Sequence, residues 1–142
     1  MTYATLDQLQ DRYGERMLIQ LTDRATPPAG AIDTDVTDRA LADAGALIDG
    51  YLKGRYRLPL ASVPPLVTDL ALKVAIYNLH GAVVAEKVAR DYQDALKLLR
   101  EIAAGIVRLD VEGAEPEASG SSGVRTNEPE RPLSNAAMKG FV

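Results

Sequence analysis

The chain of 142 residues carries 16 Lys and Arg against 20 Asp and Glu, which gives a formal charge of −4. This length fits one domain with an appendage, and the acidic balance argues against a general affinity for nucleic-acid phosphates. Aromatic residues make up 5% of the chain and cysteine is absent, so we expect an aliphatic core without disulfides, thiol nucleophiles or thiolate metal sites. The charged amino end and the lack of a long apolar run predict neither a signal peptide nor a membrane span, and hence a soluble intracellular protein.

Two short helices are predicted at the amino end. Thr5 and Gln8 have the spacing of a capping box, which predicts a helix from Leu6 to Tyr13. Gly14 interrupts this helix, and a second short helix is expected over residues 15–22. The loop that contains Pro27 and Pro28 prevents its continuation.

A longer helix of about 18 residues is predicted where apolar side chains recur every three or four positions between Val36 and Leu52. Thr34 or Asp33 is expected to cap it. Acidic residues gather at its amino end and basic residues at its carboxyl end: Asp33, Asp35 and Asp38, then Lys53, Arg55 and Arg57. This order of charge suits the helix dipole. The acidic cluster lacks the turn glycine and distal glutamate of a calcium loop, so capping is the favoured interpretation.

Prolines 59, 64 and 65 then predict an extended connector, because a residue before proline avoids helical backbone angles. The next helix is expected to begin near Pro65 and to end near His80. Its predicted apolar side comprises Leu66, Leu70, Val74, Tyr77 and Leu79. A last helix is expected over residues 85–104 with Gly105 as a left-handed cap, followed by a strand or an extended exit over residues 106–111. The fold class is therefore mostly α: a small bundle of four to five helices with extended connectors and a long extended carboxyl-terminal arm.

No pattern of residues points to catalysis. His80 is the only histidine, and the glycine-rich phosphate-binding and nucleophile-elbow motifs are absent. We therefore expect no catalytic residues, no metal site and no cofactor. The basic run Lys53–Arg57, with its interleaved Tyr56, could contact nucleic acid, although favourable charge at a helix end is the simpler interpretation.

Composition changes near Gly113, and we divide the chain into a helical domain of residues 1–112 and a flexible carboxyl-terminal arm of residues 113–142. The arm contains four Gly, three Pro, four Ser and few long apolar side chains. Fixing its backbone costs on the order of 30–60 kcal/mol, whereas burying its apolar side chains returns only about 10 kcal/mol. We therefore expect the arm to need a partner that supplies hydrogen bonds as well as pockets.

Three segments of the sequence occur in a characteristic order. The first is Ile48–Leu52 with the closely following Arg55–Leu60, the second is Val63–Leu66 at the start of a predicted helix, and the third is Tyr92–Gly105, a long predicted helix that ends in glycine. Together, across residues 1–110, they resemble the head-tail connector proteins of Mu-like tailed phages, the adaptor or head-completion class. The resemblance implies a structural virion protein of the neck, the head-tail interface, made in the bacterial host cytoplasm. It also implies a dodecameric ring under the portal protein and above a tail stopper or tail completion protein. Such a ring would enclose the DNA channel without reading bases, and would have no catalytic activity.

Related connectors send a carboxyl-terminal arm onto the portal, which implies the same docking for this chain. The arm residues expected to bind the portal are Arg131, Leu133, Met138, Lys139 and Phe141. A closed ring needs two different complementary faces on each subunit. The charges expected at the subunit interface or in the DNA channel are Asp33, Asp35, Asp38, Lys53, Arg55 and Arg57. Three alternatives stay open: a small bacterial helical regulator or interaction module, a DNA-binding protein that uses residues 53–57, and an enzyme that acts through carboxylates or lysines.

Overall fold

The computed structural model describes residues 2–111 and confirms a mostly α fold. Five helices follow in order: α1 (Leu6–Tyr13), α2 (Glu15–Thr22), α3 (Thr34–Leu52), α4 (Pro65–His80) and α5 (Glu86–Ala103). No strand forms within this described part, so residues 106–111 are an irregular exit segment. The predicted arm of residues 113–142 lies outside the described residues.

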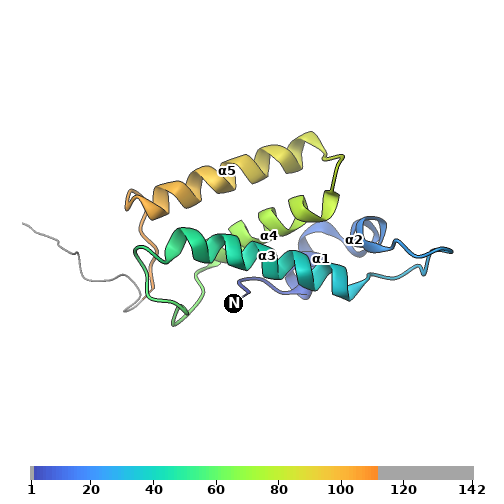
Figure 1. Cartoon of the computed structure of the whole chain (residues 1–142), viewed down its shortest axis with the longest axis horizontal. Coiled ribbons are helices and arrows are strands. Elements are labelled where there is room, and N and C mark those ends of the chain that lie inside the picture. Colours follow the sequence, from blue (N-terminus) through green and yellow to red (C-terminus); the bar gives the residue numbers. More distant parts are fainter. Residues whose placement is uncertain (1, 112–142) are drawn as a thin grey trace, which may run out of the picture.

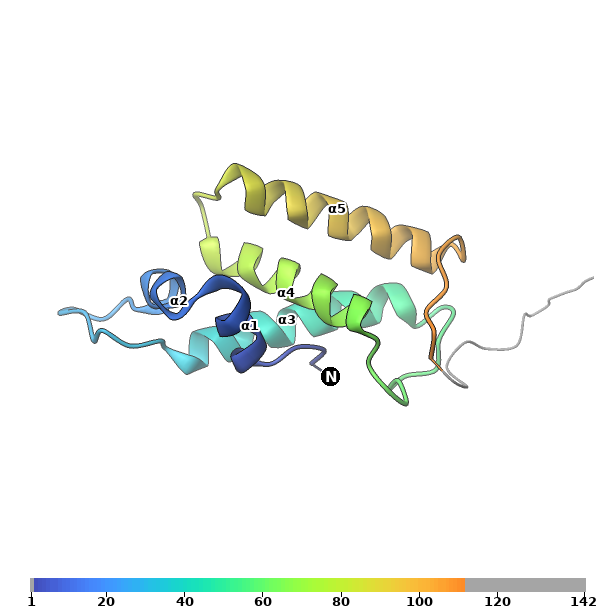
Figure 2. The same cartoon turned by 180° about the vertical axis from the view of Figure 1, so that it is seen from behind.

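The three long helices lie side by side, with α4 between α3 and α5 (Figure 1). The chain reverses direction at each connection, so α3 and α5 run the same way and α4 runs opposite to both. The short helices α1 and α2 pack on α3 and α4, and α5 lies along the other edge of the bundle (Figure 2). Within the described chain, α4 packs against all four other helices, whereas α5 packs only on α3 and α4.

The short amino-terminal helices form as local sequence signals predict. The Thr5 hydroxyl accepts a hydrogen bond from the Gln8 amide at 3.2 Å, and the Gln8 side chain accepts one from the Thr5 amide at 2.9 Å. Gly14 separates the helices with a φ of 90°, a backbone angle that side chains with a Cβ disfavour. The buried Thr22 hydroxyl donates to the Leu18 carbonyl at 2.7 Å and accepts from the Asp33 amide at 3.0 Å. Thr22 thereby ties the end of α2 to the start of α3.

Of the two expected caps for α3, Asp33 is the one used. Its carboxylate accepts a hydrogen bond from the Asp35 amide at 3.1 Å, which satisfies a free donor of the first turn. Apolar side chains of α3 then turn into the core: Ala40, Leu41, Ala44, Ile48 and Leu52. The predicted helix and its apolar side are confirmed.

The apolar stripe predicted for α4 packs on the core at every position, but burial is not confined to that one side. Leu66 and Tyr77 are only half-buried, whereas side chains between the stripe positions are buried: Val67, Ala71, Leu72, Ala75 and Ile76. The physical reason is that α4 packs on the two other long helices, α3 and α5, and also on α1 and α2, so its neighbours cover most of its circumference. Tyr77 instead stacks on Tyr92 of α5, with ring centroids 3.8 Å apart and nearly parallel planes.

The connector after α3 and the exit segment after α5 meet at the same end of the bundle. The buried Tyr56 hydroxyl accepts a hydrogen bond from the Leu109 amide at 2.9 Å, and Leu60, Leu109 and Val111 are buried beside it. Gly105, with a φ of 82°, confirms the expected left-handed end of α5. The described chain therefore ends at the end of the bundle where α3 and α5 also end.

Candidate assembly surfaces

The acidic amino end of α3 is fully on the surface. Asp33, Asp35 and Asp38 are exposed, and Asp33 is already engaged in capping the helix. A helix of 19 residues, the length of α3, spans about 28 Å, so the predicted acidic and basic clusters lie at opposite ends of the molecule. The structure does not bring these two sets of predicted residues together within one chain.

The basic residues at the carboxyl end of α3 differ in how far they are exposed to solvent. Lys53 and Arg57 are exposed, but Arg55 is half-buried, and a Cβ at Gly105 would lie 2.7 Å from its guanidinium carbon. The Arg55 guanidinium thus lies against the carboxyl end of α5, where the helix dipole favours a positive charge. Tyr56 is buried and its hydroxyl is engaged by Leu109. The interleaved tyrosine is therefore not presented to a nucleic acid for base stacking.

The α2–α3 connection, residues 23–33, extends beyond the helices at one end of the molecule (Figures 1 and 2). Asp23 closes this loop, because its carboxylate accepts hydrogen bonds from the amides of Ala29 at 3.1 Å and Gly30 at 2.7 Å. These backbone hydrogen bonds, that from Ala29 first, hold the pKa of Asp23 below its ordinary value. Sequence reasoning identified a proline-glycine loop here but missed the carboxylate that closes it.

A surface groove of about 470 Å³ lies over α4, between the α1–α2 pair and the start of α5. It exists because α5 packs only on α3 and α4 and leaves the neighbouring flank of α4 uncovered. Apolar and charged side chains share its lining: Tyr13, Met17, Ala85 and Val88, with Arg12, Lys73, Lys87 and Asp91. Sequence reasoning did not find this groove, since its lining comes from four helices and one loop.

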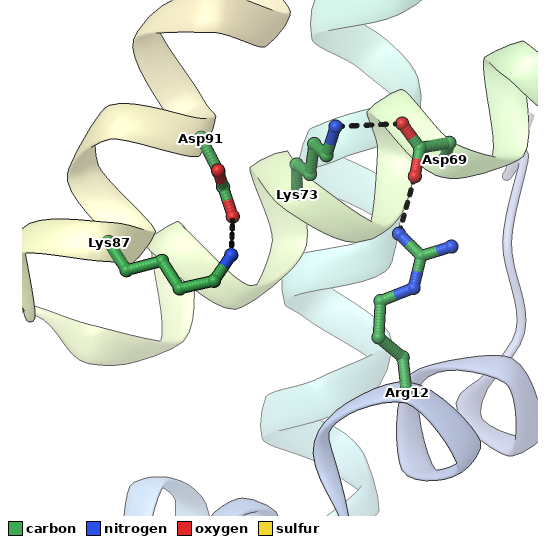
Figure 3. Close-up of polar contacts among 5 residues, drawn as sticks. All are labelled: Arg12, Asp69, Lys73, Lys87 and Asp91. Atoms are coloured by element: carbon green, nitrogen blue, oxygen red, sulfur yellow. Dashed lines mark hydrogen bonds and ion pairs between the residues drawn. The ribbon is translucent and has the colours of Figure 1, made fainter.

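The three cations that line this groove all form ion pairs (Figure 3). Asp69 of α4 accepts from Arg12 of α1 at 2.6 Å and from Lys73 of its own helix at 2.9 Å. Partial burial alone would raise the pKa of Asp69, but the hydrogen bonds and charges of Lys73 and Arg12 outweigh burial and lower it. On α5, Lys87 pairs with Asp91 at 2.9 Å. Cations therefore outnumber carboxylates along the groove.

The remaining sequence predictions concern the histidine, metal ligands, membrane spans and the arm. His80 is the last residue of α4, as expected for a helix-end histidine, and its Nδ1 lies 2.8 Å from the Ile76 carbonyl. Within residues 2–111, no three His, Asp or Glu side chains group closely enough to hold a metal ion. No helix of that same range is long and apolar enough to cross a membrane. The predicted portal-binding residues of the arm, Arg131 to Phe141, lie outside the described part of the chain.

Comparison with known proteins places the sequence among phage proteins. The family described as "Bacteriophage Mu, Gp36" matches residues 3–128. Gene product J of Escherichia phage Mu is 34% identical over 145 aligned positions, which cover the whole of both chains. The Mu-like prophage FluMu protein gp36 of Haemophilus influenzae is 29% identical, covering 99% of this chain and 98% of that protein. The family match therefore continues past Val111 to residue 128.

Proposed function

The chain belongs to the Bacteriophage Mu Gp36 family, and from this membership we propose that it is a head-tail connector subunit. Family membership indicates a phage structural or morphogenesis protein. In the proposed role the chain forms a ring under the portal protein, contacts the tail stopper or tail completion protein below, and lies in the neck of the virion. The proposed subunit is structural and catalyses no reaction.

The observation that carries the ring proposal is the separation of charge along α3. The three carboxylates at one end, which lie beside Arg24 and Arg39, and the two exposed cations at the other end do not pair with each other within a chain, because about 28 Å of helix separates them. In a ring each subunit presents one surface to the neighbour before it and a different surface to the neighbour after it. Opposite charges at opposite ends of a rigid helix suit such a head-to-tail contact.

Charge also suits the proposed DNA channel. The chain is acidic overall, at −4, and repulsion between carboxylates and phosphates would let DNA pass without adhering. We propose that those acidic residues of α3 not covered by a neighbour face the channel. DNA would then be enclosed without recognition of its bases.

Electron microscopy of the full chain mixed with the portal protein of the same phage tests the role directly. We expect a ring of twelve copies attached to one face of the dodecameric portal. The role would be refuted if the chain did not bind the portal under conditions in which that portal is assembled. Duplex DNA affinity that fell steeply with salt would instead favour the DNA-binding alternative.

Charge reversal tests the contact between subunits. We expect Asp35→Lys with Asp38→Lys to abolish ring formation, and Lys53→Glu with Arg57→Glu to restore it when present in the same chain. Asp43→Lys is the matched control, because Asp43 is exposed in the middle of α3 and its reversal leaves both helix ends intact. Equal ring formation by the end variant and the Asp43 variant would exclude the proposed charge contact.

The arm has its own test. Deletion of residues 128–142 is expected to weaken portal binding, and so is replacement of Leu133, Met138 and Phe141 by serine. Replacement of Ser134 and Asn135 by alanine keeps the arm's length and apolar anchors, and is expected to leave portal binding unchanged. Portal binding that is the same with and without residues 128–142 would refute docking by the arm.

A further inference from the structure

We infer that the groove between the α1–α2 pair and α5 receives the first residues of the arm of an adjacent copy, residues 112–118. The inference rests on the proposed ring only in that copies must be adjacent. It assigns the groove as a docking site between chains and leaves the later arm residues to reach the portal. The occupant is thus a segment of this same polypeptide.

The lining of the groove is suited to an acidic segment with small apolar residues. Arg12, Lys73 and Lys87 contribute three cations to its lining. Asp91 pairs with Lys87, and Asp69 pairs with both Arg12 and Lys73, so the cations exceed the carboxylates by one. Tyr13, Met17, Ala85 and Val88 provide the apolar part of its lining. Lys87 is reachable from solvent, with 82% of its side chain exposed, although it pairs with Asp91.

The sequence directly after Val111 has the complementary chemistry. Residues 112–118 read EGAEPEA, with three glutamates and no cation, and small apolar residues between them. The first cation beyond them is Arg125. The family match extends through this segment to residue 128.

The segment after Val111 is too short to place Glu115 beside Ala85 of the same chain, so the occupied groove belongs to another copy. Ala85 of the groove and Ala103 are 103 − 85 = 18 positions apart at the two ends of α5, about 27 Å along the helix. The hydrogen bond from Leu109 to Tyr56 holds the exit segment at the far end, where α3 and α5 finish. Glu115 is four residues past Val111 and therefore extends at most about 14 Å from it. Glu115 cannot reach Ala85 in the groove of its own chain.

Disulfide trapping tests this inference in the full chain without the portal, because the natural sequence has no cysteine. Ala85→Cys is placed in one chain and Glu115→Cys in another, and the two are mixed at increasing concentration under mild oxidation. We expect a disulfide-linked dimer with a yield at least about fivefold above that of the control pair. The control replaces Ala85→Cys by Ala46→Cys, since Ala46 is exposed on α3 away from the groove.

Reversing one charge in the groove and one in the arm gives a second test of the trapping yield. Lys87→Glu in the groove chain is expected to lower the trapping yield about threefold to fivefold, and Glu117→Lys in the arm chain to restore it. Lys97→Glu, a charge reversal at another exposed lysine of α5 outside the groove, is expected to leave the yield unchanged. Equal yields for the groove and control pairs would overturn the inference. A disulfide formed within a single chain that carries both cysteines would overturn docking between copies.

The trapping result is independent of the portal experiment. Trapping between copies with no portal binding would leave the groove assignment standing and remove the connector role. Portal binding without disulfide trapping would support the connector role and overturn the groove assignment.

Discussion

Gly105 offers the sharpest test of how the bundle ends. Its φ of 82° lies in the left-handed region, where a residue with a Cβ is strained, and the Arg55 guanidinium lies where that Cβ would be. Gly105→Ala therefore imposes two costs at once. Gly50→Ala is the matched control, because Gly50 lies inside α3 with nothing within 4 Å of a Cβ and without a positive φ.

The two substitutions are expected to change stability in opposite directions. A left-handed backbone costs an alanine about 1–2 kcal/mol. Displacing the Arg55 guanidinium, which a Cβ would approach to 2.7 Å, forfeits up to about 1 kcal/mol of favourable charge at the end of α5. Gly105→Ala should thus lower the free energy of unfolding by about 2 kcal/mol. Gly50→Ala should raise it by about 0.5–1 kcal/mol, because glycine is a poor helix former.

Urea unfolding of the full chain, followed by far-ultraviolet circular dichroism, measures both changes. The double variant Arg55→Ala with Gly105→Ala separates them, since the cost of Gly105→Ala in the Arg55→Ala background should fall to the backbone cost alone. An unfolding free energy of Gly105→Ala within about 0.5 kcal/mol of the natural chain would refute the left-handed end and the close approach of Arg55.

Three further perturbations test the packing. Tyr56→Phe removes the acceptor of the buried Leu109 amide and should cost about 1–3 kcal/mol of unfolding free energy in the same urea assay; a neutral result would contradict the hydrogen bond. Leu99→Ala empties a fully buried site on α5 and should cost about 2–5 kcal/mol, with a smaller loss arguing that α5 packs loosely. Because the pKa of Asp69 in the folded chain lies below its ordinary value of 3.8, the ionised Asp69 stabilises the fold at pH values above 3.8. This stabilisation is lost as the pH falls through the lower pKa of the folded chain. Stability should therefore fall as pH drops below about 4, and Asp69→Asn should flatten that fall; an unchanged pH profile would exclude the contribution.

Local signals in the sequence determined the helices and their ends. The capping box of Thr5 and Gln8, the cap at Asp33 and the glycine at position 105 each act over a few residues, so they are legible without knowledge of the fold. The order of segments around Ile48–Leu60 and Tyr92–Gly105 was sufficient to indicate the phage family, which the comparisons confirm. The ring, the portal contact and the role of the arm stay predictions.

Contacts between distant residues required the tertiary structure. Burial around α4 depends on which of its sides the neighbouring helices cover, and the periodicity of one helix does not encode that arrangement. Leu109 meets Tyr56 across 53 positions, Arg12 meets Asp69 across 57, and the groove combines side chains from α1, α2, α4 and α5. A helix's own hydrogen bonds and caps span four residues or fewer and can be read along the chain. Packing instead joins whichever surfaces the folded helices bring together, so the surfaces available to partners emerge only in three dimensions.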